Sequence, residues 1–250
     1  CGGDNSSCSG CTDPNAENYD ETADVDDGSC EYFSEPQIIN VPGDYSTIQA
    51  GINASSDGDT VLVAAGTYTE NINFNGKNIA IIGADRETTI IDGNQAQWVV
   101  IIDSDVDSSG LLKSFTIQNG NAGAGTTPEG MGGGVYCFES SPSLENVTIS
   151  GSLATLGGGI YCINNSSPSL VNVTILNNLA FGGEMESDGN GGGIYCYNSS
   201  PNFENVTISG NRVQNSNGGG VFLNNSSPTF EYVTFRDNIA DLNGGGICIS

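Results

Sequence analysis

The second half of the chain repeats one phrase with small variations. Each repeat holds a Gly triplet, an apolar–aromatic–Cys step, a Ser-Ser-Pro turn and the motif Asn-Val-Thr-Ile, as in residues 132–149. The triplets start at residues 132, 157, 191, 218 and 244, so successive repeats lie 25, 34, 27 and 26 residues apart. A period in this range is typical of a solenoid, in which each repeat forms one coil. The repeat therefore restricts the fold more than any other property of the sequence.

Short β-branched segments separated by Gly, Asn and Asp fill the chain from Thr60 onward, and no helical periodicity of useful length accompanies them. Each repeat contains three such segments: one after the Gly triplet, one around Pro-x-apolar, and one through Val-Thr-Ile and the Asn-rich stretch behind it. Three strands in about 25–27 residues per coil predict an all-β fold, a right-handed parallel β-helix.

Stacked coils place like residues above like residues. We expect an amide ladder at a bend and a column of thiols that points inward. The members are Asn146, Asn172 and Asn205 for the amides, and Cys137, Cys162 and Cys196 for the thiols, with the thiol column continuing as Leu223 and then Cys248. Because Leu223 occupies one position of the thiol column, we favour buried packing over disulfides for these cysteines.

The chain divides into three expected regions. Residues 1–35 are polar and acidic, and we expect a tether with a Cys-stapled module there. Residues 36–59 are expected to form the cap of the β-helix, and residues 60–250 the β-helix itself. In the cap, Asp44 or Ser46 is expected to begin a short helix. Because Ser250 falls inside a repeat, we expect the natural chain to continue. Cys1 is either a lipidated N-terminal cysteine of a bacterial lipoprotein or simply the point where this sequence begins.

The charge balance limits the partners. The chain has 30 acidic and 5 basic residues and no His, for a net charge of −25. Nucleic acids and anionic membrane surfaces require clustered Lys and Arg, so neither is an expected partner. Membrane attachment would come only through a lipid on Cys1.

Residues 10–30 (GCTDPNAENYDETADVDDGSC) resemble a short Cys-bounded, Asp-rich motif of secreted bacterial surface proteins. The resemblance implies a disulfide between Cys11 and Cys30 and leaves the pairing of Cys1 and Cys8 open. Alternating carboxylates suit Ca2+, which prefers several oxygen ligands, so we expect calcium here rather than a merely acidic turn. The candidate ligands are Asp20, Asp24, Asp26 and Asp27.

A second acidic run, Asp103, Asp105 and Asp107, has the spacing of the first half of an EF-hand loop. It lacks Gly at the sixth loop position, where Ser108 stands, and Glu at the twelfth, where Ser114 stands. Calcium is therefore one interpretation, and a solvated turn is the one we favour.

The stretch from Tyr45 to Gly93, followed by the Gly-Gly-Gly-Ile-Tyr-Cys repeats, resembles pectin-lyase-like β-helix proteins, especially surface proteins with polymorphic-outer-membrane-type repeats. Enzymes of that superfamily use clustered carboxylates with basic side chains. None of the five basic residues here lies beside an Asp pair in the regular coils. The aromatic side chains after the Gly triplets are either an outward column that stacks on sugars or, as we favour, rings that stack on one another. They are Tyr136, Tyr161, Tyr195 and Phe222.

These features favour a non-catalytic, adhesin-like or structural protein at the bacterial cell surface. It would present a calcium-stiffened β-helix face to a glycan or a surface protein, with self-association as another possibility. The alternative is a polysaccharide lyase or glycoside hydrolase.

Overall fold

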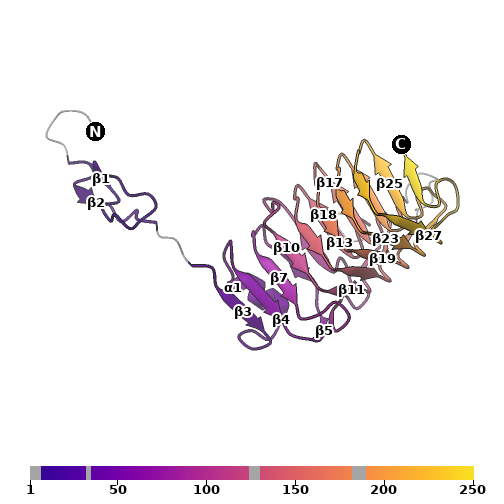
Figure 1. The fold of residues 1–250 in the computed structure, drawn as a ribbon, viewed down its shortest axis with the longest axis horizontal. Helices are drawn as coiled ribbons and strands as arrows, with labels where there is room; N and C mark the ends of the chain where they lie inside the picture. Colours follow the sequence, from indigo (N-terminus) through magenta and orange to yellow (C-terminus); the bar gives the residue numbers. More distant parts are fainter. Residues whose placement is uncertain (1–6, 32–34, 124–129, 182–189) are drawn as a thin grey trace. The chain divides into compact units, whose positions relative to one another are not determined.

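The computed structural model describes residues 7–31, 35–123, 130–181 and 190–250. The chain forms two compact units, residues 1–36 and residues 37–250. In the described part of the first unit, two short parallel strands pair: β1 (Ser9–Gly10) and β2 (Val25–Asp26). The second unit is a right-handed β-helix whose coils stack along one axis, from α1 to β29 (Figure 1).

Four parallel sheets run along the described part of the β-helix. Within each sheet, every strand pairs in register with the strands of the neighbouring coils, about 4.8 Å away, and the strands at the two ends of a sheet have one such neighbour. The first sheet contains β3 (Ile38–Val41), β4 (Thr60–Val63), β7 (Ala80–Gly83), β10 (Leu111–Lys113), β14 (Ser143–Glu145), β18 (Ser169–Val171), β22 (Asn202–Glu204) and β26 (Thr229–Glu231). The second contains β5 (Gly66–Thr69), β8 (Thr89–Asp92), β11 (Thr116–Gln118), β15 (Thr148–Ser150), β19 (Thr174–Leu176), β23 (Thr207–Ser209) and β27 (Thr234–Arg236).

The third sheet is short and contains β12 (Asn121–Ala122), β16 (Leu153–Ala154), β20 (Leu179–Phe181), β24 (Arg212–Gln214) and β28 (Ile239–Ala240). The fourth contains β6 (Ile72–Asn73), β9 (Val100–Ile102), β13 (Val135–Phe138), β17 (Ile160–Ile163), β21 (Ile194–Tyr197), β25 (Val221–Asn224) and β29 (Ile247–Ile249). The expectation of three strands per coil is therefore wrong for the later coils, which have four. The expected third strand is divided because Gly151 adopts a left-handed conformation (φ 62°) and turns the chain between β15 and β16.

Period-2 alternation fills the interior. In Asn-Val-Thr-Ile, Val147 and Ile149 are fully buried while Thr148, between them, is partly exposed. Equivalent apolar residues of every coil join one continuous core. Burial of this core provides the main drive for folding, since each apolar side chain removed from water contributes about 1.5–3 kcal/mol.

The Gly triplet allows the coils to approach each other closely. Gly157 has a φ of 62°, which disfavours other residues. A Cβ atom on Gly158 would lie 2.5 Å from the carbonyl oxygens of both Gly192 and Leu179, closer than packing permits. The turn before β17 therefore requires glycine for its backbone angle and for its contacts.

The β-helix begins with the expected short helix, α1 (Ile48–Ala54), which places Ile48 and Ile52 on the interior. Its N-cap is Thr47, whose hydroxyl accepts a hydrogen bond from the Ala50 amide, and not Asp44 or Ser46. Asp44 instead accepts hydrogen bonds from the amide and side chain of Asn40. No helix in the described part of the chain has the length and apolar character needed to span a membrane.

Candidate functional site

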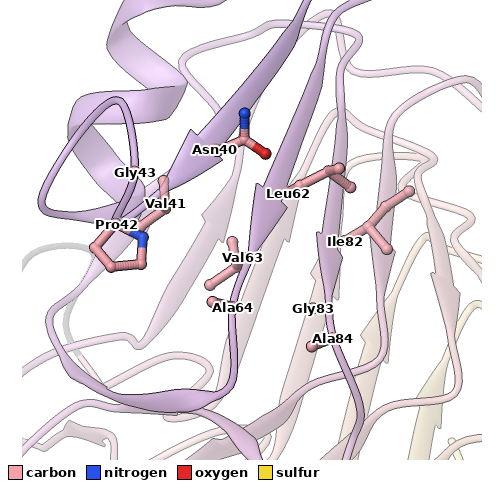
Figure 2. A pocket seen from close by; sticks show the side chains of 10 residues that line it. All are labelled: Asn40, Val41, Pro42, Gly43, Leu62, Val63, Ala64, Ile82, Gly83 and Ala84. Carbon is pink, nitrogen blue, oxygen red and sulfur yellow. The ribbon is translucent and has the colours of Figure 1, made fainter.

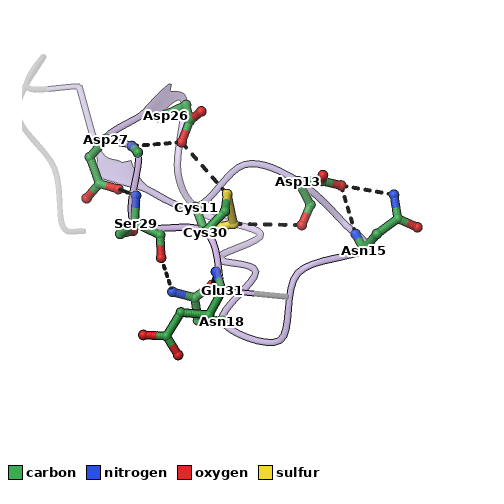
Figure 3. The surroundings of a disulfide bond; sticks show 10 residues. Cys11, Asp13, Asn15, Asn18, Asp26, Asp27, Ser29, Cys30 and Glu31 are labelled. Carbon is green, nitrogen blue, oxygen red and sulfur yellow. Dashed lines mark hydrogen bonds between the residues drawn. A yellow bond between two sulfur atoms is a disulfide. The ribbon is translucent and has the colours of Figure 1, made fainter. Parts of the chain in front are cut away.

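The N-terminal module is closed by the predicted disulfide between Cys11 and Cys30, with Cα atoms 4.7 Å apart (Figure 3). Cys8 is buried and also disulfide-bonded. A structural disulfide fits an extracellular protein. The lipidation predicted for Cys1 lies outside the described residues.

The carboxylates of this module cap its turns. Asp20 accepts hydrogen bonds from the Thr22 amide (2.8 Å) and hydroxyl (2.7 Å), and Asp27 accepts one from the Ser29 amide (3.0 Å). Hydrogen bonds lower the pKa of Asp20 and Asp27. The largest contribution comes from the side chain of Thr22 for Asp20 and from the side chain of Ser29 for Asp27. Asp26 and Asp24 also accept from backbone amides, those of Gly28 and Cys8 respectively.

The second acidic run has three different surroundings. Asp107 accepts from the amide and hydroxyl of Ser109, and this lowers its pKa. Asp105 is exposed, with a φ of 78°. Asp103 accepts from Asn73 Nδ2 through Oδ2, whereas its buried Oδ1 has no hydrogen-bond partner.

Across residues 7–31, 35–123, 130–181 and 190–250, no three Asp, Glu, His or Cys side chains gather as metal ligands. The structure thus does not bring either acidic run together around one point. Calcium binding by Asp20, Asp24, Asp26 and Asp27, or by Asp103, Asp105 and Asp107, remains a prediction from the sequence.

An external amide ladder lies at the bend between the first and second sheets. Asn205 Nδ2 donates to Asn172 Oδ1 (3.2 Å), and Asn172 Nδ2 donates to Asn146 Oδ1 (3.0 Å). All three residues have a positive φ, a conformation that Asn tolerates better than most residues. The ladder therefore stabilises the bend through its side-chain hydrogen bonds and through the backbone angle that Asn tolerates.

An internal amide ladder lies between the second and third sheets and was not singled out from the sequence. Asn211 is fully buried; its Nδ2 donates to Ile175 O (2.9 Å) and Asn238 Oδ1 (3.0 Å), while its Oδ1 accepts from the amide and side chain of Asn178. Ser152 holds the equivalent position one coil before Asn178 and donates its backbone amide to Asn178 Oδ1. In the sequence, the ladder is marked by the common position of its residues after Val-Thr-Ile. That position indicates burial only when the turn at Gly151, which directs the side chain that follows it inward, is known.

The thiols of Cys137, Cys162 and Cys196 are buried, free, and paired in register. The hydrogen bond with Cys162 and then burial raise the pKa of the Cys137 thiol well above its ordinary value. Leu223 continues the column, but Cys248 does not, because the register pairs it with Phe222. Cys248 follows the Gly triplet by one residue fewer than the other three cysteines, and one residue of displacement reverses the side of a strand.

The aromatic column lies on the other side of the fourth sheet. Tyr136, Tyr161, Tyr195 and Phe222 stack at centroid distances of 5.2–5.8 Å with nearly parallel planes, and none is more than 8% exposed. Ala122 and Ala154 of the third sheet belong to the same cluster. The rings therefore bind one another and are not an open platform for sugars. Burial raises the pKa of the three phenols.

The basic side chains serve local structure. Lys77 Nζ donates to the carbonyls of Ile52, Asn53 and Ser55 at the end of α1. Three of the other four basic side chains form ion pairs in the described residues: Arg86–Glu87, Lys113–Glu145 and Arg212–Asp241; the fourth, Arg236 at the end of β27, is exposed. Asp92 accepts from the amides of Gln118 and Asn119, not from a basic group.

Among the hollows on the described surface, three are lined by residues outside the aromatic column. One, of about 340 Å3, lies against β3, β4 and β7, and its lining is almost entirely apolar, including Val41, Leu62 and Ile82 (Figure 2). Its one polar side chain, Asn40, is engaged with Asp44.

The other two hollows, of about 440 and 430 Å3, share Glu139, Asn164 and Asn165 and form one groove along a corner of the coils. We call it the corner groove; its further lining residues are Asp105, Val106, Asp107, Ser140, Ser141, Asn198, Ser200 and Asn225. Amides from successive coils line it, and Asn225 Nδ2 donates to Asn198 Oδ1.

A match to a protein-family model supports the fold. The model of the family "Right handed beta helix region" matches residues 50–250. A solved structure, "Pectin methylesterase from Carrot", is 16% identical with a TM-score of 0.40, over 88% of this chain and 90% of that chain. No curated protein matches the chain.

Proposed function

Because the chain belongs to the family of the right-handed β-helix region, we propose a function that this scaffold supports without catalysis. The protein is a rigid surface rod of the cell exterior that presents the corner groove to a glycan. The proposed role is adhesion through a glycan. Binding of a partner protein in the same groove is the second outcome that the test below can give.

The corner groove carries this proposal. A glycan offers many hydroxyl groups, and each must find a hydrogen-bond partner when it leaves water. Exposed or half-exposed amides and hydroxyls recur there once per coil, about 4.8 Å apart, as in Asn165, Asn198 and Asn225. A linear polymer lying along the axis would meet the same groups again in each coil.

The use of the basic side chains supports a non-catalytic role. Lys77 caps α1, and Arg86, Lys113 and Arg212 pair with surface carboxylates. In the described coils, these groups serve local structure rather than a carboxylate cluster of the kind that polysaccharide-cleaving β-helices use.

Binding to a panel of immobilised polysaccharides tests the proposal. The informative variants are Asn165→Gly and Asn198→Gly, because both positions have a positive φ that glycine adopts freely, so only the amide is lost. Asn172→Gly on the external ladder is the matched control, with the same φ but outside the groove. We expect the groove variants to lose glycan binding and the control to keep it.

Two results would count against the proposal. Release of new reducing or unsaturated sugar ends during the incubation would favour the enzymatic alternative. Retention of a protein partner, with no glycan bound, would replace the glycan by a protein.

Calcium stiffening is part of the same proposal. A cation bound only by the native state raises the melting temperature. We expect calorimetric unfolding in excess Ca2+ to occur at a higher temperature than in excess chelator, and equal melting temperatures would remove calcium from the proposal.

A further inference from the structure

A pocket of about 600 Å3 lies on the outer side of the fourth sheet and shares no lining residue with the corner groove. It spans four successive strands, from β6 to β17. Apart from Asn73 and Asp103, its lining is aromatic or aliphatic. The lining residues are Asn73, Trp98, Ile101, Asp103, Met131, Tyr136, Phe138 and Ile163.

Three rings form the aromatic part of this pocket. The Trp98 and Tyr136 rings lie 5.6 Å apart at 40°, and the Tyr136 and Phe138 rings lie 6.4 Å apart in nearly parallel planes. Trp98 Nε1 donates to Met131 O, which fixes the indole. The ring column of the later coils ends here, so that Tyr136 stacks on Tyr161 on one side and borders the pocket on the other.

Asp103 supplies the charge of the pocket. Its Oδ1 is buried without a hydrogen-bond partner, and its Oδ2 has only a long bond of 3.3 Å from Asn73. No Lys or Arg is among the lining residues. The carboxylate is close enough to Tyr136 to raise the pKa of that phenol, after the larger effect of burial. The carboxylate is therefore weakly paired within the chain, and a ligand that brings a donor adds a hydrogen bond to it.

We propose that this pocket binds a small organic ammonium ion with an apolar body. The ammonium group donates to Asp103, and a charge-assisted bond of this kind is stronger than one from a neutral hydroxyl. Trp98, the aromatic side chain that attracts cations most strongly, lines the same pocket, while Ile101, Phe138 and Ile163 cover the apolar body of the ligand. The net charge of −25 raises the local concentration of cations further.

A sugar fits this pocket less well than an ammonium ion. A sugar ring carries several hydroxyls, and among the described lining residues Asn73, Asp103 and the Tyr136 hydroxyl are the groups that could accept from them. A ligand with one charged donor and an apolar remainder matches the composition of the lining.

The chain has one tryptophan, and it lines this pocket, so its fluorescence reports on the site directly. The full chain would be titrated with 2-phenylethylammonium chloride and with 2-phenylethanol, its neutral counterpart of the same shape. We expect a saturable change in Trp98 emission with the ammonium ion, and affinity for the alcohol at least about tenfold weaker. Isothermal calorimetry of the same titrations detects binding that leaves the emission unchanged.

Two variants assign the effect to one carboxylate. Asp103→Asn keeps the size of the side chain and removes the charge, and we expect it to weaken ammonium binding at least about tenfold. Asp105→Asn removes the same charge two residues away, from an exposed side chain outside the pocket, and should leave the affinity unchanged.

Equal affinity of the ammonium ion and the alcohol, or equal affinity of Asp103→Asn and the parent chain, would overturn the proposal. So would the absence of any binding heat with the ammonium ion. A neutral trisaccharide that binds with dependence on Asp103, where the ammonium ion does not, would identify a sugar site instead.

Discussion

The described part of the N-terminal module buries only Cys8, Cys11 and Ala16 among its apolar residues, whereas the β-helix encloses a continuous apolar interior from Ile39 to Leu223. A segment as short as the module cannot remove enough apolar surface from water to offset its loss of chain entropy. A disulfide and carboxylate-capped turns replace the core there. In the β-helix, each coil gains its stability from identical neighbours, so no covalent link is needed between coils.

The contrast also separates two uses of cysteine. Cys11 and Cys30 are cross-linked, while Cys137, Cys162 and Cys196 are free thiols in one buried column. The residue type alone does not distinguish these roles. The surroundings do, because a thiol among Val, Ile and Leu side chains behaves as a small apolar group.

The largest effect should come from the core of the β-helix. Phe115 is fully buried, and Phe115→Ala should lower the free energy of unfolding of the β-helix by about 3–5 kcal/mol. Hydrogen exchange followed by mass spectrometry would show faster exchange in residues 37–250 and no change in the module. Thr148→Ala, on the outward side of β15, serves as the control and should change stability by less than about 0.5 kcal/mol. A similar loss of unfolding free energy in both variants would mean that the buried interior is not the main source of the stability of the β-helix.

The next effect concerns the module alone. The disulfide joins residues 19 positions apart, and Cys11→Ser together with Cys30→Ser should destabilise the module by about 3 kcal/mol, enough to unfold it. Proteolysis should then cleave within residues 7–31 and leave the β-helix intact. Loss of the β-helix in the same digest would contradict the independence of the two units.

A smaller effect distinguishes the two amide ladders. Asn211→Ala removes the acceptor of the buried Asn178 amide and the donor to Ile175 O and Asn238 Oδ1, and should cost about 2–3 kcal/mol. Asn172→Gly keeps the backbone angle and removes an exposed amide, so it should cost less than about 1 kcal/mol. Urea unfolding of both variants measures the difference, and equal costs would show that burial of the inner ladder contributes nothing extra.

The smallest effect should appear in acid. Hydrogen bonds lower the folded-state pKa of Asp20 and Asp27 below the ordinary value of 3.8. Their contribution to the stability of the module is therefore complete above the unfolded-state pKa and is lost as the pH falls through the lowered folded-state values. Exchange of the Ser29 amide, measured between pH 5 and pH 2 (about the range that spans both states), should become faster relative to the intrinsic rate. In Asp27→Asn this acid dependence should be weaker; if it is unchanged, Asp27 does not carry the effect.

Much of the fold could be predicted because repetition makes one local rule apply many times. The spacing of the Gly triplets and the alternation in Val-Thr-Ile predicted the parallel β-helix, and the in-register Asn and Cys positions predicted their columns. Prediction failed where one residue alters the register or direction of the chain. Gly151 divides a strand in two, and Cys248 lies one place short of the thiol column.

The candidate sites could be predicted less well for a physical reason. The corner groove and the Asp103 pocket combine residues from several coils, and their shape depends on turns that are not repeated identically. Asp103 was singled out as part of an evenly spaced acidic run, yet its surroundings differ from those of Asp105 and Asp107. Spacing along the chain did not indicate which carboxylate lies among aromatic rings.

The internal amide ladder has a consequence for how such a protein can change in length. Each Asn of the ladder accepts from the coil before it and donates to the coil after it, through the same atoms. The upper and lower faces of one coil are thus interchangeable with those of any other. Duplication or deletion of a gene segment encoding one whole coil would join compatible faces without creating a new interface. The number of coils, and with it the length of the β-helix, can therefore vary by recombination, one coil at a time.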